Sequence, residues 1–289
     1  MTSSTDSTAQ HGASASAIQA HYDVGNEFYR LWLDPGMVYS AALWDNPQDT
    51  RELAWAQANK IEFHLRNAAL PPARSLLDIG CGWGGLLCRA LELGADRTVG
   101  LTLSQAQVDH ISALGRPGLE ARLESWQDHR PAAPYGAIIS IGAFEHFTKP
   151  GDTSERKVAI YRDFFAACRS WLAKDARLSL QTIAYGRLQR DDPNVKLMSQ
   201  IFPDSDLPRL EEIIQAADGL FEIARLRNDR VDYARTCEIW ANNLRSRRAE
   251  AIALVGREQT ARYERYLKLS SYGFWTVNLW LLRLRLVAV

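Results

Sequence analysis

The segment Leu76–Gly85, with the sequence LLDIGCGWGG, restricts the fold more than any other part of this chain. A short, mostly apolar run leads directly into glycines, and an apolar helix is predicted to follow from Leu86. Glycines let the main chain turn sharply and pass close beneath a ligand, with the amide groups at the start of the next helix facing it. A strand, a glycine-rich turn and a helix in this order are typical of the first unit of a parallel α/β sheet.

The chain after Pro71-Pro72 continues this alternation of short strands and helices. Strands are predicted at residues 75–79, 98–101, 119–123, 137–141, 177–183 and 221–226. Helices are predicted at residues 86–93, 105–114, 158–171 and 209–217. A long helical region over 232–270 and a closing strand or strand pair over 274–289 complete the pattern. We therefore predict an α/β fold with helices on both faces of the sheet.

The N-terminal residues differ in composition from the rest. Residues 1–17 are rich in Ser, Thr and Ala, which predicts a disordered arm, and residues 18–289 are predicted to form a single domain. Helices are expected over 18–33 and from Asn46-Pro47 onward. The apolar face of the second helix is predicted to consist of Ala54, Ala58, Ile61 and Leu65. Segments 18–70, 184–208 and 232–270 are predicted to form a helical cap.

The charge and cysteine content narrow the function classes. Lys+Arg and Asp+Glu number 34 each, and this balance argues against a nucleic-acid-binding protein. The four cysteines have no metal-ligand spacing, so we expect reduced thiols, a cytoplasmic protein and no metal. No apolar run reaches the roughly 18 residues that span a membrane, and no secretory signal precedes the domain. Peripheral contact with a membrane remains open, as does the oligomeric state.

Two cofactor classes fit the glycine-rich turn. The spacing Asp78-x-Gly80-x-Gly82 places a carboxylate at the end of a strand, where the ammonium group of an amino-acid ligand can bind. The rival is a dinucleotide loop of the form G-x-G-x-x-G, for which Gly85 supplies the third glycine. A dinucleotide site expects an acidic residue roughly 20 positions further on. The second strand ends in residues 100–104, GLTLS, which contain no acidic residue and count against NAD.

Several further segments resemble the cyclopropane fatty acid synthase and mycolic acid cyclopropane synthase family. They are residues 21–29 (HYDVGNEFY), 33–40 (LDPGMVYS), 77–84, 100–107, 140–147 (SIGAFEHF), 202–203, 207–208 and 233–236 (YART), with Trp240. These segments follow one another in the family's order, and the resemblance covers residues 18–289. It implies an S-adenosylmethionine (SAM)-dependent methyltransferase with a Rossmann-like sheet.

The resemblance also implies which residues bind the cofactor. Tyr39 and Ser40 would contact the methionyl part of SAM. The loop beneath it would consist of Asp78, Gly80, Cys81, Gly82, Trp83 and Gly84. Thr102, Leu103 and Gln107 would hold the ribose region in place of the usual acidic residue. Trp126 and Gln127 would flank the adenine, although the family more often has an acidic residue at the position of Gln127.

Catalysis in this family begins when an alkene attacks the SAM methyl group, and aromatic faces stabilise the carbocation that forms. A bicarbonate held by a Cys, a Glu, a His and a Tyr then removes a proton. Glu145 and Tyr233 match this set. Ala41 and Gln181 replace the Cys and the His, and Ser270 replaces a later cysteine.

The substitutions remove a thiol and an imidazole from an anion pocket, so we doubt that bicarbonate is held in the usual way. Glu145 itself then becomes the candidate base. Tyr233 and His146 are further catalytic candidates, and His146 has a purely structural role as its alternative.

The function predicted from these residues is SAM-dependent C-methylation of an apolar, unsaturated small molecule in specialised metabolism. Formation of cyclopropane or methyl-branched fatty acyl lipids is the alternative. Methylation of an amine nitrogen, by resemblance to plant alkaloid N-methyltransferases, is a third possibility. A non-catalytic SAM-binding subunit is a fourth, against which the presence of Glu145 and Tyr233 counts.

Overall fold

The computed structural model describes residues 25–189 and 205–289. The arm expected over 1–17 and the first part of the helix expected over 18–33 lie outside the described residues. The same holds for residues 190–204 of the predicted 184–208 cap segment.

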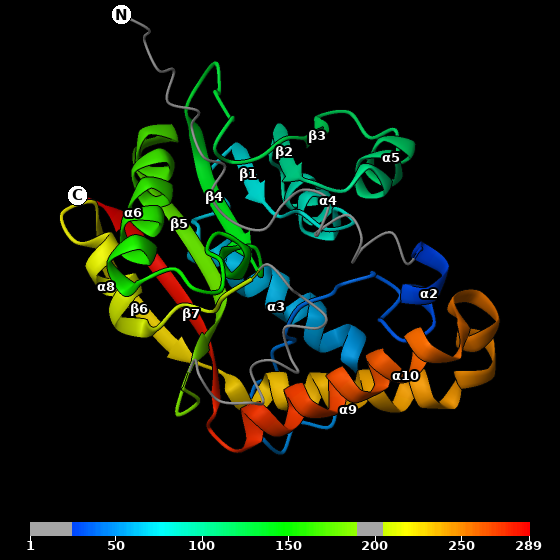
Figure 1. Ribbon diagram of the computed structural model, residues 1–289. Helices are drawn as coiled ribbons and strands as arrows, with labels where there is room; N and C mark the ends of the chain where they lie inside the picture. The colour runs from blue at the N-terminus through cyan, green and yellow to red at the C-terminus, as the bar shows by residue number, and fades with distance from the viewer. Residues whose placement is uncertain (1–24, 190–204) are drawn as a thin grey trace, which may run out of the picture.

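A seven-stranded sheet forms the centre of the molecule, in the order β3-β2-β1-β4-β5-β7-β6 (Figure 1). Its strands are β1 Ser75–Ile79, β2 Arg97–Thr102, β3 Leu119–Leu123, β4 Tyr135–Ile141, β5 Leu172–Tyr185, β6 Phe221–Asn228 and β7 Leu279–Ala288. Strands β1 to β5 run parallel to one another, and β7 runs antiparallel between β5 and β6. The predicted α/β sheet is confirmed, and the closing element is one strand rather than a pair.

Helices cover both faces of the sheet, so central strands such as β1 and β2 are buried on both sides. Helices α3 Leu53–Asn67, α4 Gly85–Glu92 and α5 Gln105–Ala113 contribute to an apolar core on one face, against Leu76 and Ile139. Helices α6 Ser154–Trp171 and α8 Leu210–Ala217 contribute to the core on the other face, against Leu77 and Ile138. Neighbouring strand residues therefore point into different cores, as the period of two requires.

Helix α3 departs from the prediction in its start and in its buried face. It begins at Leu53 rather than at Asn46-Pro47, because Asn46 starts a turn in which its side chain accepts from the Gln48 N–H at 2.9 Å. Ile61 is buried as expected, but Ala54 is exposed. Four polar residues of the helix are buried, namely Gln57, Lys60, His64 and Asn67.

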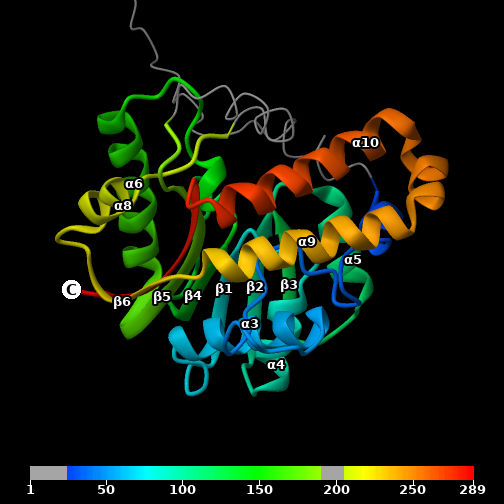
Figure 2. The ribbon, with the colours of Figure 1, turned by 90° about the horizontal axis from the view of Figure 1, so that it is seen from below.

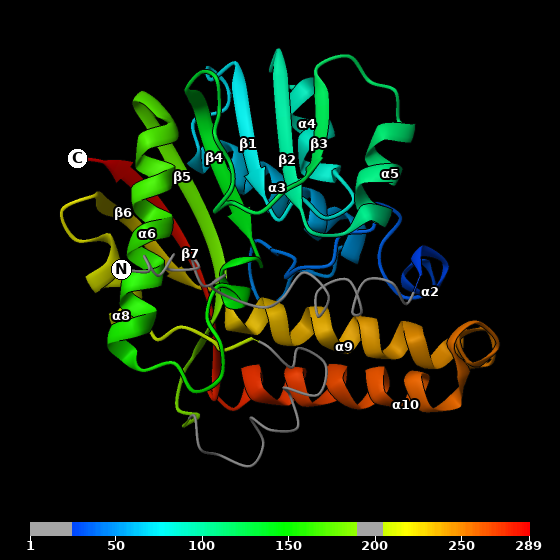
Figure 3. The same cartoon turned by 45° about the horizontal axis from the view of Figure 1, so that its top comes forward.

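The cap contains α2 Asn26–Arg30 and two long helices, α9 Arg230–Ser246 and α10 Arg248–Trp275. The helical region predicted over 232–270 is confirmed, and it consists of the two helices α9 and α10. The chain leaves helical geometry at Arg247 (φ −109°, ψ 25°) and at Gly256 (φ 80°, ψ 164°). α10 consequently returns alongside α9 in the opposite direction, and the pair lies across the carboxyl ends of the parallel strands (Figures 2 and 3).

Within the described residues, no helix is long and apolar enough to cross a membrane.

Candidate active site

A cavity of about 220 Å³ opens at the carboxyl ends of β1, β2 and β4. It brings together twelve of the residues that the resemblance assigned to the cofactor, from five separate segments. They are Tyr39, Ser40, Asp78, Gly80, Cys81, Gly82, Trp83, Thr102, Leu103, Gln107, Trp126 and Gln127. α/β proteins bind nucleotide-like ligands at the carboxyl ends of their parallel strands, beside the first glycine-rich turn.

Gly84 does not line this cavity. It has a left-handed conformation (φ 83°) as the residue before α4, and a Cβ there would lie 2.8 Å from Cγ1 of Ile111. Glycine is therefore required at this position because a side chain there would collide with Ile111 of the neighbouring helix α5. Gly80 has the closest neighbour in the loop, because its Cβ would lie 2.6 Å from the Cβ of Ala143.

Asp78 is the charged residue at the base of the cavity. Its side chain is only 3% exposed, and its Oδ1 atom has no hydrogen-bond partner among the described residues. Burial raises the pKa of this carboxyl, and the nearby Lys60 ammonium lowers it. A buried carboxylate without a partner is unfavourable. The site therefore fits a ligand that brings a cationic donor, as the ammonium group of an amino acid does.

Lys60 lines the same cavity and was not predicted from the sequence. Its Nζ donates to Ser40 Oγ at 2.7 Å, and Gln57 Nε2 donates to the Ser40 carbonyl at 2.8 Å. Asp34 holds the same loop by accepting from the Gly36 and Val38 amides, each at 2.9 Å. Apolar periodicity does not detect buried polar residues of this kind. The signal in the sequence that could have indicated them is the spacing of Gln57, Lys60 and His64, which places three polar residues on one side of a helix.

The orientation of the Gln107 side chain follows from its partner. The Thr102 hydroxyl accepts from the Ser104 N–H at 3.1 Å and donates to Gln107 Oε1 at 2.6 Å. The NH₂ group of Gln107 is thereby left for other acceptors, such as hydroxyl groups of a ligand in the cavity.

The far end of the cavity is aromatic and partly acidic. Trp126 packs against Phe147 and Phe164, with ring centroids 5.3 and 5.4 Å apart. Glu124 also lines this end and was missed by the sequence analysis. It follows directly after β3, so its position at the end of a predicted strand was the signal that could have found it.

A second cavity of about 110 Å³ adjoins the first. The two cavities share Tyr39, Ser40, Gly142 and His146. Most of the other residues that line the second cavity are apolar or aromatic. They include Ile183, Leu188, Leu207, Trp240, Leu267, Phe274, Leu279 and Leu281. The cap supplies Trp240 from α9, and Leu267 and Phe274 from α10.

Glu145 is an acidic residue on this second cavity and lies on the short 3₁₀ helix η1 Phe144–His146. Its Oε1 accepts from the Ile183 N–H at 2.6 Å. Its Oε2 is buried and has no hydrogen-bond partner among the described residues. Burial raises the pKa of this carboxyl to about 7, against the lowering effects of the Ile183 amide, the Glu145 amide and the Thr182 hydroxyl. A carboxyl with this pKa can take up a proton near neutral pH, as a general base requires.

The other two catalytic candidates lie on the same cavity. His146 Nδ1 is 2.6 Å from Ser205 Oγ, and burial lowers the pKa of its imidazole to about 4, so the ring is neutral at pH 7. Tyr233 stacks on Phe274 with ring centroids 4.6 Å apart and meets Trp240 edge-on at 6.1 Å.

The three positions that differ from the family's anion pocket do not behave alike. Gln181 and Ser270 line the second cavity, whereas Ala41 does not. The Ala41 carbonyl accepts from Arg283, at 3.2 Å from its Nη2, and Gln181 Oε1 accepts from the Nε of the same arginine at 2.8 Å. Arg283 is 1% exposed, and no sequence motif indicated it.

The comparisons with known proteins agree with this geometry. A family model described as mycolic acid cyclopropane synthetase matches residues 9–283. The chain is 36% identical over 284 residues to the cyclopropane mycolic acid synthase MmaA2 of Mycobacterium bovis, covering 90% of this chain and 94% of that protein. The chain belongs to the mycolic acid cyclopropane synthetase family.

Solved structures of relatives share the whole fold of this family member. The cyclopropane synthase MmaA2 from Mycobacterium tuberculosis aligns with a TM-score of 0.84 and 32% identity, covering 96% of this chain and 99% of that one. The mycolic acid cyclopropane synthase CmaA1, in complex with SAH and CTAB, also aligns with a TM-score of 0.84, at 31% identity and the same coverage. The resemblance stated from the sequence is thereby confirmed, and the protein is a SAM-dependent methyltransferase.

Proposed function

We propose that this protein transfers the methyl group of SAM to a carbon–carbon double bond in a long apolar acyl chain. The observation that carries the proposal is the second, largely apolar cavity, which meets the first one at Tyr39, Ser40, Gly142 and His146. The acceptor would enter there and present its double bond at the boundary. A relative whose structure contains SAH together with the lipid-like CTAB supports an acyl chain as the occupant.

The prediction from the sequence favoured a small specialised metabolite as acceptor. The relatives named above are mycolic acid cyclopropane synthases, so the comparisons support the alternative, an acyl lipid, better. The apolar lining of the second cavity is compatible with an acyl chain, because hydrophobic side chains there contribute affinity without requiring a polar group on the acceptor.

The residues of the first cavity fit SAM by their chemistry. Asp78 would accept from the ammonium group, and the Gln107 NH₂ group would donate to ribose hydroxyls. Trp126 would pack against the adenine, with Gln127 at its edge. When bound, SAM supplies an electrophilic methyl group on a sulfonium ion.

The residues of the second cavity would control what happens to the acceptor. The double bond would use its electron pair to form the new carbon–carbon bond while the methyl–sulfur bond breaks with its electron pair going to sulfur, which releases S-adenosylhomocysteine and leaves a carbocation on the acyl chain. The faces of Tyr233 and Trp240 stabilise this cation without reacting with it. Glu145 then removes a proton. Loss of the proton from the new methyl group closes a cyclopropane, and loss from a neighbouring chain carbon gives a methyl-branched alkene.

Glu145 would act as the base itself. Ala41 carries no thiol, and Gln181, whose Oε1 is engaged by Arg283, offers only an uncharged amide NH₂ group in place of the imidazole, so these positions supply fewer donors than the family's bicarbonate set. Because Glu145 lines the second cavity and its Oε2 has no hydrogen-bond partner among the described residues, its lone pairs are available for a proton.

Mass spectrometry of the product tests the proposal. Purified protein with SAM is offered a cis-monounsaturated long-chain acyl group as a phospholipid, as a thioester and as a free acid, beside an unsaturated terpene of similar polarity. We expect a gain of one CH₂ unit on an acyl substrate, and NMR then separates a ring from a methyl branch. Methylation of the terpene alone would restore the small-molecule prediction, and methylation of neither would contradict both.

A further inference from the structure

Two buried ionisable groups of opposite kind line the first cavity without forming an ion pair with each other. They are Asp78, at the end of β1, and Lys60, on α3, which are 3% and 2% exposed. Asp78 Oδ1 has no hydrogen-bond partner among the described residues, and Lys60 forms no ion pair with any of them. Buried charges are normally paired, because their desolvation is costly. This cavity therefore fits a ligand that brings one charge of each sign.

The Lys60 side chain has one hydrogen-bond partner within the described part of the chain, the hydroxyl of Ser40, with Nζ and Oγ 2.7 Å apart. An ammonium group has only donors, so the Ser40 oxygen accepts, and the hydroxyl hydrogen is left for another acceptor. Gln57 Nε2 holds the same residue from α3 by donating to its main-chain carbonyl at 2.8 Å. Because Ser40 lines the first cavity, its hydroxyl can donate to a ligand there.

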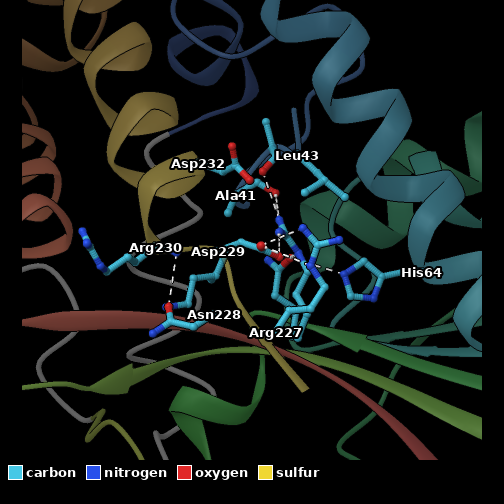
Figure 4. Close-up of polar contacts among 12 residues, drawn as sticks. Ala41, Leu43, His64, Arg227, Asn228, Asp229, Arg230 and Asp232 are labelled. Atoms are coloured by element: carbon cyan, nitrogen blue, oxygen red, sulfur yellow. Dashed lines mark hydrogen bonds and ion pairs between the residues drawn. The ribbon is translucent and has the colours of Figure 1, made fainter. Parts of the chain in front are cut away.

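The charges around Lys60 leave it without a counter-ion. Burial and the charge of Arg283 lower the pKa of Lys60 to about 7. Asp34 and Asp78 act in the opposite direction, but neither forms an ion pair with it. Arg283 differs, since its Nη1 donates to Asp229 Oδ2 at 2.5 Å (Figure 4). The protein thus neutralises this arginine itself, whereas an anion that arrives with a ligand would favour the charged form of Lys60.

The amino-acid end of SAM has the matching pair of charges, an ammonium and a carboxylate group on one carbon atom. The contacts given above use Asp78 for the ammonium group but assign nothing to the carboxylate. The Ser40 hydroxyl supplies a donor on the same cavity, and Lys60 supplies a positive charge directly behind that donor. Hydrogen bonds to an ionised acceptor are about twice as strong as neutral ones, so this arrangement would add to the affinity for SAM.

We propose that Lys60 is a positioning residue for the cofactor, which holds the Ser40 hydroxyl as the hydrogen-bond donor to the SAM carboxylate and supplies the counter-charge. Asp78 and Lys60 thus recognise the two charges of the amino-acid end separately. This inference rests on the part of the proposed function in which Asp78 accepts from the SAM ammonium group. It does not depend on the identity of the methyl acceptor, because cofactor binding is measured without turnover.

Calorimetric titration with two ligands tests the proposal. Decarboxylated SAM keeps the ammonium group, the sulfonium ion and the adenosine, and it lacks only the carboxylate. Lys60→Met keeps the length of the side chain and removes the charge. We expect this variant to bind SAM about tenfold or more weakly, the range for a lost hydrogen bond to a charged group, while decarboxylated SAM is weakened less than about twofold. Equal losses for both ligands, as from a merely structural role, or an unchanged affinity for SAM, would overturn the proposal.

The part played by the serine is tested with Ser40→Ala and with the double variant. We expect Ser40→Ala to show the same selective loss of SAM affinity. If Lys60 acts through the Ser40 hydroxyl, Lys60→Met combined with Ser40→Ala binds SAM no more weakly than the weaker of the two single variants. Losses that multiply would show that the two residues act independently and would refute the positioning role.

Two further variants separate this inference from the rest of the site. Asp78→Ala should weaken both ligands about equally, since both keep the ammonium group. If it weakened neither, the assigned contact of Asp78 would fail, and the Lys60→Met comparison would still decide the role of Lys60. The matched control is Lys174→Met, which removes the same charge at an exposed position of β5 that lines neither cavity. It should leave both affinities within about twofold of wild type.

Discussion

Replacement of Glu145 by Gln should change the free energy of unfolding and the catalytic rate in opposite directions. The substitution keeps the shape of the side chain and removes the carboxylate. In the folded protein, burial raises the pKa of this carboxyl from 4.5 to about 7. The folded state therefore binds the proton more tightly than the unfolded chain does. Stability falls as the pH rises from 4.5 to about 7, and the full loss is present above that range.

The size of this effect follows from the shift. At 1.36 kcal/mol for each pKa unit, ionisation of Glu145 lowers the free energy of unfolding by about 3 kcal/mol. Glu145→Gln removes that loss. We expect the variant to be more stable than wild type by up to about 3 kcal/mol at about pH 8, and to match it at about pH 4, as measured by urea unfolding.

Turnover should change in the opposite direction. Loss of a general base lowers the rate about 100- to 10,000-fold, whereas the affinity for SAH should stay within about twofold because Glu145 does not line the first cavity. Wild-type kcat should rise with pH through about 7. The control Glu238→Gln makes the same change at an exposed position on α9 and should leave turnover unchanged. Full turnover by Glu145→Gln in single-turnover experiments, where methyl transfer itself limits the rate, would refute the assignment of the base.

Three further predictions follow from the site. Asp78→Ala should weaken SAM binding about 10- to 150-fold through the lost charge-assisted contact, and calorimetric titration of a well-folded variant with unchanged affinity would contradict this. Gly84→Ala should lower the free energy of unfolding by about 1–3 kcal/mol, because a Cβ at φ 83° would lie 2.8 Å from Ile111, while a denaturant titration that matched wild type would argue against the clash. Because Ala41 and Gln181 are engaged by Arg283, removal of bicarbonate should leave the methylation rate unchanged, and a rate that recovers on adding it back would show that Glu145 is not sufficient.

The elements that the sequence predicted well are those whose signal is local. β1 and β3 occupy the predicted residues, and α6 ends at Trp171 as predicted. These elements were predictable because an apolar run between turn residues involves only neighbouring positions of the chain. Twelve of the residues that the resemblance assigned to the cofactor line one cavity, and a strand with its following turn brings Asp78, Gly80 and Gly82 together there by itself.

The positions where prediction failed depend on partners that are distant in the chain. The polar spacing around Lys60 does not reveal what buries this lysine of α3, because its acceptor Ser40 and the nearby charge of Asp78 come from two other segments. The break of the cap into α9 and α10 was missed as well, since the apolar positions on both sides of Arg247 suit a helix.

An α/β sheet with a glycine-rich turn suited to SAM could be predicted from the sequence, as could the position of Glu145 after a strand end where such sites lie. The contact of Arg283 with Gln181, which is 102 residues away along the chain, is visible only in the folded protein. The physical reason is that a buried polar side chain is stable only when all its partners are present, and those partners are brought together by the folded sheet and cap.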